Sequence, residues 1–95
     1  MFVTIRKYTG CGDQSEIARV TTTQLLPVLQ QVPGFQSFVG VDIGDRSIIS
    51  IGIFDSKGAA ELANERARDV VRKSLAPLLP NPPAIMVGEI FADSR

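Results

Sequence analysis

The chain has 95 residues, of which 44% are hydrophobic, and its 10 Lys and Arg residues balance 10 Asp and Glu residues. This length fits one domain, and the hydrophobic content is too high for a disordered segment. The zero net charge argues against a nucleic-acid-binding protein, because phosphate backbones are bound by clustered, uncompensated cations.

The first predicted element is a strand over residues 1–8, which is rich in β-branched and aromatic residues. A glycine-containing turn follows, and Asp13 then has the properties of a helix N-cap, with Glu16 completing a capping box. Apolar residues at helical spacing extend this helix to about Val32. Pro27 lacks an amide hydrogen, so we expect either a kink there or a break at which Pro27 begins a second short helix.

A hairpin is predicted next. Pro33 and Gly34 end the first helix, and strands follow over residues 35–42 and 47–54. The connection between these two strands is too short for anything but a tight turn. The two strands therefore pair with each other in antiparallel orientation.

The last third of the sequence predicts a second helix over about residues 57–76, which Asp55 and Ser56 cap. Its apolar stripe is dominated by alanine, which allows close approach to a sheet, and its charged residues form a solvated face. Prolines concentrated in residues 77–83 predict an extended, stiff connection. The fourth strand is predicted over residues 84–91.

This element order, β-α-β-β-α-β, predicts a ferredoxin-like α+β fold in a single domain over residues 1–95, with both helices on one face of a four-stranded antiparallel sheet. Three strands nevertheless carry apolar residues on both faces. The third strand, for example, presents Ile49 and Ile51 on one side and Ile48 on the other. Because an uncovered apolar face marks an interaction site, we expect a homodimer in which two open sheet faces meet and form a barrel.

The same alternation assigns other strand residues to faces. It places Phe35 and Phe38 on opposite faces of the second strand. Glu89 interrupts the apolar fourth strand, and we expect its carboxylate either to point into the barrel lumen or to pair across the dimer with Arg6 or Arg46.

Several classes of site and location are not expected. Without histidine and with one cysteine, Cys11, the chain is unsuited to a zinc or haem site and cannot form an intramolecular disulfide. No apolar stretch is long enough to span a membrane, and the amino terminus lacks the order of a signal peptide. We therefore expect a cytoplasmic protein with no metal, no cofactor and no membrane partner.

Two short runs and the topology resemble a known family. The runs are Pro33-Gly34-Phe35 before the second strand and Phe54-Asp55-Ser56 before the second helix. With the length and element order, they resemble the dimeric α+β barrel proteins, and most closely the antibiotic-biosynthesis-monooxygenase-like group. The resemblance covers residues 2–91.

Known members of that group include cofactor-independent monooxygenases of aromatic polyketides, quinol-type oxygenases, haem-degrading enzymes and many small proteins of unknown function. The haem-degrading branch relies on a histidine ligand and a tryptophan, and this chain has neither. The resemblance therefore implies a monooxygenase of the cofactor-free kind, if the chain is an enzyme at all.

Three residues are candidates for the substrate site that the resemblance implies, namely Arg6, Tyr8 and Asn64. Arg6 and Tyr8 share one face of the first strand with Thr4, where Arg6 could hold an anionic oxygen and Tyr8 could donate a hydrogen bond. Asn64 lies near the core stripe of the second helix, where a buried amide needs partners. Ordinary surface contacts are the alternative for all three. Cys11 is either a loop residue or a reactive thiol.

Two functions remain open. One is a small cofactor-independent monooxygenase-like protein that acts on an apolar or aromatic molecule. The other is a non-catalytic, homodimeric ligand-binding or stress-associated protein with the same fold. An RNA-binding module of ferredoxin-like topology is disfavoured by the zero net charge.

Overall fold

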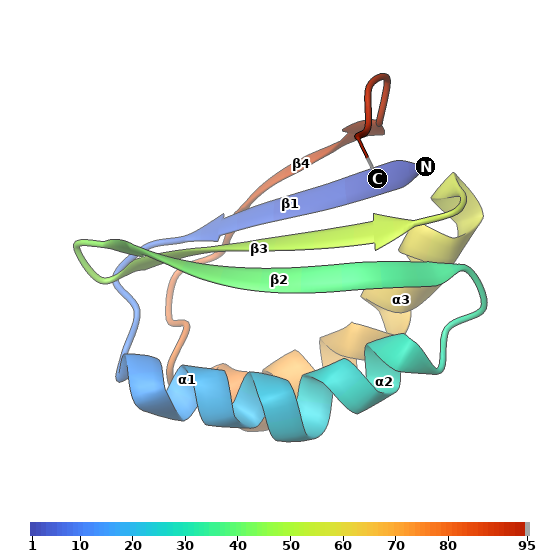
Figure 1. Cartoon of the computed structure of the whole chain (residues 1–95). Coiled ribbons are helices and arrows are strands. Elements are labelled where there is room, and N and C mark those ends of the chain that lie inside the picture. Colours follow the sequence, from blue (N-terminus) through green and yellow to red (C-terminus); the bar gives the residue numbers. More distant parts are fainter. Residues whose placement is uncertain (95) are drawn as a thin grey trace.

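The computed structural model describes residues 1–94. Strands β1 (Phe2–Tyr8), β2 (Phe35–Gly44), β3 (Ser47–Phe54) and β4 (Ala84–Glu89) form one antiparallel sheet in the order β2-β3-β1-β4. All helical segments lie on one face of this sheet, and the other face is open (Figure 1). The structure therefore confirms the predicted ferredoxin-like α+β arrangement.

The first helical region has three segments: α1 (Gln14–Val20), the π-helical η1 (Thr21–Leu25) and α2 (Leu26–Gln30). The Asp13 side chain caps α1 by accepting a hydrogen bond from the backbone N–H of Ser15 at 3.2 Å. The expected capping box is wrong, because both carboxylate oxygens of Glu16 accept hydrogen bonds from Arg19.

Proline sets the position of the π-helical turns. Pro27 follows η1 closely and lies in the first turn of α2, which begins at Leu26, so the predicted second short helix is present. The backbone stays helical through Leu25 and Leu26, so the two helices are not separated by a break. The widened turn keeps the preceding carbonyl groups clear of the proline ring. A π-helical turn also precedes a proline in the second helical region. There α3 (Lys57–Val70) continues into the π-helical η2 (Val71–Leu75), and Pro77 follows.

The hairpin contains a feature that alternation alone does not predict. The β2–β3 register shifts between Phe35 and Ser37, so Phe35 and Phe38 both lie on the helix-covered face, opposite Phe54 and Gly52 respectively. The rings of Phe35 and Phe54 meet edge to face with centroids 6.0 Å apart. The prediction that Phe35 and Phe38 lie on opposite faces is therefore wrong.

The core lies between this face of the sheet and the helices. Its buried side chains come from both helical regions and from β3, and they are Ile17, Val20, Leu25, Leu29, Val32, Phe54, Ala59, Ala60, Ala63 and Leu75, together with Cys11. Cys11 is only 1% exposed. Cys11 lies in the loop between β1 and α1, as predicted, and its side chain packs into the core.

We expect the Cys11 thiol of the folded protein to react with dithiobis(nitrobenzoate) at least about 100-fold more slowly than in urea. Burial raises the pKa of this thiol, and the thiolate is the reacting form. Because the folded protein holds the proton more tightly, this group lowers stability only above the ordinary thiol pKa of about 8.5. Equal rates for folded and unfolded protein at about pH 8 would show that the thiol is accessible.

The fourth strand is shorter than predicted. Its pairing with β1 ends at Glu89, opposite Phe2, and one further hydrogen bond joins the Ile90 N–H to the Met1 carbonyl oxygen at 2.8 Å. Phe91 lies beyond the sheet and is 99% exposed. Within the single chain, Glu89 pairs with the amino terminus at 3.9 Å. Its pairing with Arg6 or Arg46 across a dimer stays a prediction.

The open face of the sheet is apolar. One row of side chains crosses all four strands in register, from Met86 through Ile5 and Ile51 to Val39. Met86 and Val39 are 54% and 52% exposed. Within residues 1–94, no helix combines the length and apolar character needed to cross a membrane.

Candidate functional site

A pocket of about 440 Å³ lies between the helix-covered face of the sheet and α3 with η2. Its walls are mostly apolar, and its polar groups are few, which is the usual character of a small-molecule site. Among the lining residues are Leu25, Leu29, Phe38, Phe54, Ala67, Val71 and Leu79.

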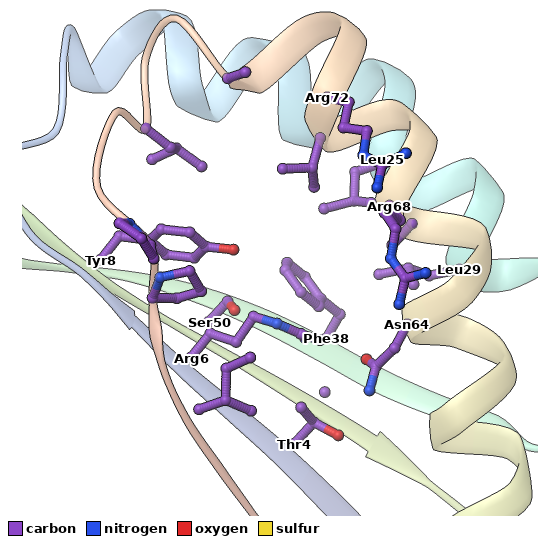
Figure 2. Close-up of a pocket in the computed structure, with 18 of the residues that line it drawn as sticks. Thr4, Arg6, Tyr8, Leu25, Leu29, Phe38, Ser50, Asn64, Arg68 and Arg72 are labelled. Atoms are coloured by element: carbon purple, nitrogen blue, oxygen red, sulfur yellow. The ribbon is translucent and has the colours of Figure 1, made fainter.

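The floor of the pocket is built by the alternation of β1. Thr4, Arg6 and Tyr8 point to the helix-covered face, as Figure 2 shows. Gly52 lies opposite Thr4 and Ser50 lies opposite Arg6 on β3. Ser50 is small and leaves space for the pocket above Arg6, whereas a β-carbon on Gly52 would lie 3.0 Å from the Phe54 ring, so the glycine makes room for that ring.

The third predicted residue, Asn64, reaches the same pocket from α3. Its side chain points from the helix toward the sheet, above Thr4 (Figure 2). The structure therefore brings Arg6, Tyr8 and Asn64 together around one cavity, although they come from two elements far apart in the sequence.

The polar groups of this pocket have few partners of their own. Thr4 is 2% exposed, and its Oγ1 atom is buried with no hydrogen-bond partner among the described residues. A buried hydroxyl without a partner costs about 1–3 kcal/mol, which a bound ligand or water can offset. Within residues 1–94, the side chains of Arg6, Tyr8 and Asn64 also make no hydrogen bond or ion pair with the protein.

Tyr8 is suited to act as a hydrogen-bond donor. Burial raises its pKa, and the nearby charge of Arg6 offsets part of that effect. The hydroxyl therefore keeps its proton at neutral pH, and Figure 2 shows it directed into the cavity.

Several lining residues were not predicted from the sequence. The proline-rich connection after η2 forms one wall through Pro80, Pro82 and Pro83. It is held in place by Asn81, whose Nδ2 donates to the Thr9 carbonyl oxygen at 3.0 Å. The sequence signal was the concentration of prolines, which indicates a stiff segment but not its location.

Two charged residues also belong to the pocket. Arg68 of α3 and Arg72 of η2 line it, although the sequence assigned the charged residues of this helix to a solvated face. No three His, Cys, Asp or Glu side chains of residues 1–94 lie close enough together to hold a metal ion.

A second pocket of about 320 Å³ lies on the other side of the core, between α1 with η1 and the β2–β3 hairpin. Phe38 and Ser50 line both pockets. These two residues therefore separate the cavities, and Phe38 limits the length of any molecule that enters from the α3 side.

No protein-family model and no curated protein matches the sequence. Solved structures do match along nearly the whole chain. A protein of unknown function from Nitrosomonas europaea, NE2512, superposes with a TM-score of 0.79 at 14% identity, covering 99% of this chain and 92% of that one.

Two further structures carry functional names. The monooxygenase from the gene ActVA-Orf6 of Streptomyces coelicolor, in complex with nanaomycin D, gives a TM-score of 0.72 at 20% identity, covering 97% of this chain and 92% of that one. A putative antibiotic biosynthesis monooxygenase from Bordetella bronchiseptica gives 0.76 at 11% identity, covering 96% and 97%. These similarities confirm the predicted resemblance to the antibiotic-biosynthesis-monooxygenase-like group at the level of the fold.

Proposed function

We propose that this protein is a cofactor-independent monooxygenase-like enzyme that binds an apolar or aromatic small molecule in the α3 pocket. The observation that carries the proposal is the convergence of Thr4, Arg6, Tyr8 and Asn64 on a mostly apolar cavity, where none of them has a protein partner among residues 1–94. The fold shared with the named monooxygenases supports it.

The proposed chemistry needs no redox group from the protein. A phenol-type substrate can itself reduce dioxygen: in an anthrone, the methylene carbon loses two hydrogens and gains one oxygen atom. The second oxygen atom leaves as water, so the substrate supplies all four electrons. Arg6 would stabilise the phenolate that donates these electrons, and Tyr8 and Asn64 would orient it.

The test uses 1,8-dihydroxyanthrone and an oxygen electrode. We expect one dioxygen consumed for each anthraquinone formed, and a rate about 100-fold lower in Arg6→Gln and in Asn64→Leu, because each removes a group that contacts the reacting anion. Arg66→Gln, which removes an exposed cation of α3 that does not line the pocket, is the matched control and should keep the full rate.

The outcomes separate the two functions. Binding of the anthrone without oxygen uptake above the buffer rate would favour the non-catalytic ligand-binding protein. No binding at all would show that the pocket does not take aromatic molecules, and the proposal would be wrong.

We further propose that two copies associate through the open sheet face. The row Met86, Ile5, Ile51 and Val39 presents apolar side chains to solvent in the single chain, and β-branched and methionine side chains of this kind pack well between facing sheets. The dimeric α+β barrel proteins that the sequence resembles are built in this way.

A further inference from the structure

One edge of the pocket carries a row of polar side chains along a helix. Asn64, Arg68 and Arg72 follow one another at four-residue spacing on α3 and η2, and all three line the pocket. Residues at this spacing share one side of a helix. Figure 2 shows Arg68 and Arg72 above Asn64 on the same side of the helix.

The polar side chains of the pocket differ in how far they are exposed to solvent. Thr4 on the floor is buried, Arg6 and Asn64 are half-buried, and Arg68 and Arg72 are exposed. The two arginines of the helix therefore lie toward the mouth of the pocket, and Thr4, Arg6 and Asn64 lie deeper.

The lining of this pocket is positively charged, although the whole chain has no net charge. Its lining includes three arginines, Arg6, Arg68 and Arg72, and no Asp or Glu. Glu65 and Asp69 precede the two helix arginines by three residues, a spacing at which ion pairs form readily. Neither pair is present among the described residues, so the guanidinium groups remain available to an anion from outside.

We propose that the ligand of this pocket is an aromatic carboxylate, whose carboxylate is bound by Arg68 and Arg72 at the mouth while its ring packs against the apolar walls. The inference rests on the proposed function and adds the substrate class. Guanidinium groups bind carboxylates through paired, charge-assisted hydrogen bonds, which a neutral ester cannot form.

The test compares 2-naphthoate with methyl 2-naphthoate by isothermal titration calorimetry. The two probes share one ring system and differ in charge. We expect the wild-type protein to bind the naphthoate at least about tenfold more tightly than the ester at low salt. This preference should weaken as salt is added, because the two arginines are exposed.

Two double variants test whether Arg68 and Arg72 cause the preference for the naphthoate. In Arg68→Gln/Arg72→Gln, the naphthoate should bind about tenfold more weakly, and the ester should bind as it does to the wild type. Arg66→Gln/Lys73→Gln removes the same charge from exposed residues of the same helical region that do not line the pocket, and should change neither affinity. All four side chains are exposed, so circular dichroism should show unchanged folding.

The results distinguish the inference from the proposed function. Equal affinity of the wild type for both probes would overturn the inference and leave the pocket as an aromatic site. Equal losses in both double variants would also overturn it, because general charge would then account for the preference. If neither probe binds the wild-type protein, the inference fails together with the pocket's proposed role.

Discussion

Gly34→Ala is expected to lower the free energy of unfolding by about 2–5 kcal/mol, because the new side chain meets both backbone strain and a clash. Gly34 has a φ of +92°, which L side chains rarely adopt. A β-carbon there would overlap Asp55 Oδ1 and lie 2.8 Å from Asp55 Cγ and 2.9 Å from the Ala59 β-carbon. The Gly34 carbonyl oxygen also accepts a hydrogen bond from the Asp55 N–H at 2.8 Å, so the two segments cannot separate freely.

Urea unfolding followed by circular dichroism, at one fixed protein concentration, measures this loss. Gly58→Ala is the matched control, since Gly58 lies in the first turn of α3 with only Ser56 Oγ within 4.0 Å. Helix propensity predicts that this change raises stability by up to about 1 kcal/mol. If both variants move in the same direction, the local geometry assigned to Gly34 is wrong.

Ile51→Lys is expected to convert the proposed homodimer into a monomer without unfolding the chain. Ile51 lies in the middle of the open face, between Ile5 and Val39. In the single chain a lysine there can extend into solvent, whereas in a face-to-face dimer two uncompensated charges would be buried together. A buried, unpaired charge costs about 3–5 kcal/mol, which corresponds to a dissociation constant about 150-fold to 5,000-fold higher.

Sedimentation velocity over a range of protein concentrations measures the association. Gln30→Lys adds the same charge to an exposed position of α2 and should leave the dimer intact. A dimeric mass for Ile51→Lys would exclude the open face as the interface. A monomeric mass for the wild type at all concentrations would contradict the homodimer itself.

The architecture could be predicted because its signals are local. Capping residues and apolar periodicity act within one or two turns, so Asp13 and Ser56 indicated where α1 and α3 begin. The short loop between β2 and β3 indicated the hairpin. The positions of Arg6, Tyr8 and Asn64 around a pocket followed from the same periodicities, once the resemblance had suggested those residue types.

What could not be predicted depends on long-range packing. The bulge in β2 moves Phe35 to the face of Phe38. The contact of the Phe35 ring with Phe54, a residue of another strand, stabilises this position. Arg68 and Arg72 are exposed as predicted, but their place at the pocket was not predicted, because helical periodicity does not reveal how far a helix extends over the sheet. The loop position of Cys11 was predicted but its burial was not, because that burial depends on segments distant in the sequence.

The position of β1 in the sheet has a consequence for biosynthesis. This strand comes first in the chain, yet it pairs on one edge with β3 and on the other with β4, the last strand (Figure 1). During translation, the β2–β3 hairpin can form as soon as it leaves the ribosome, but β1 keeps one unpaired edge until residues 84–89 have emerged. Because Phe2, Val3 and Ile5 make this strand strongly apolar, the nascent chain is most prone to aggregation during that interval.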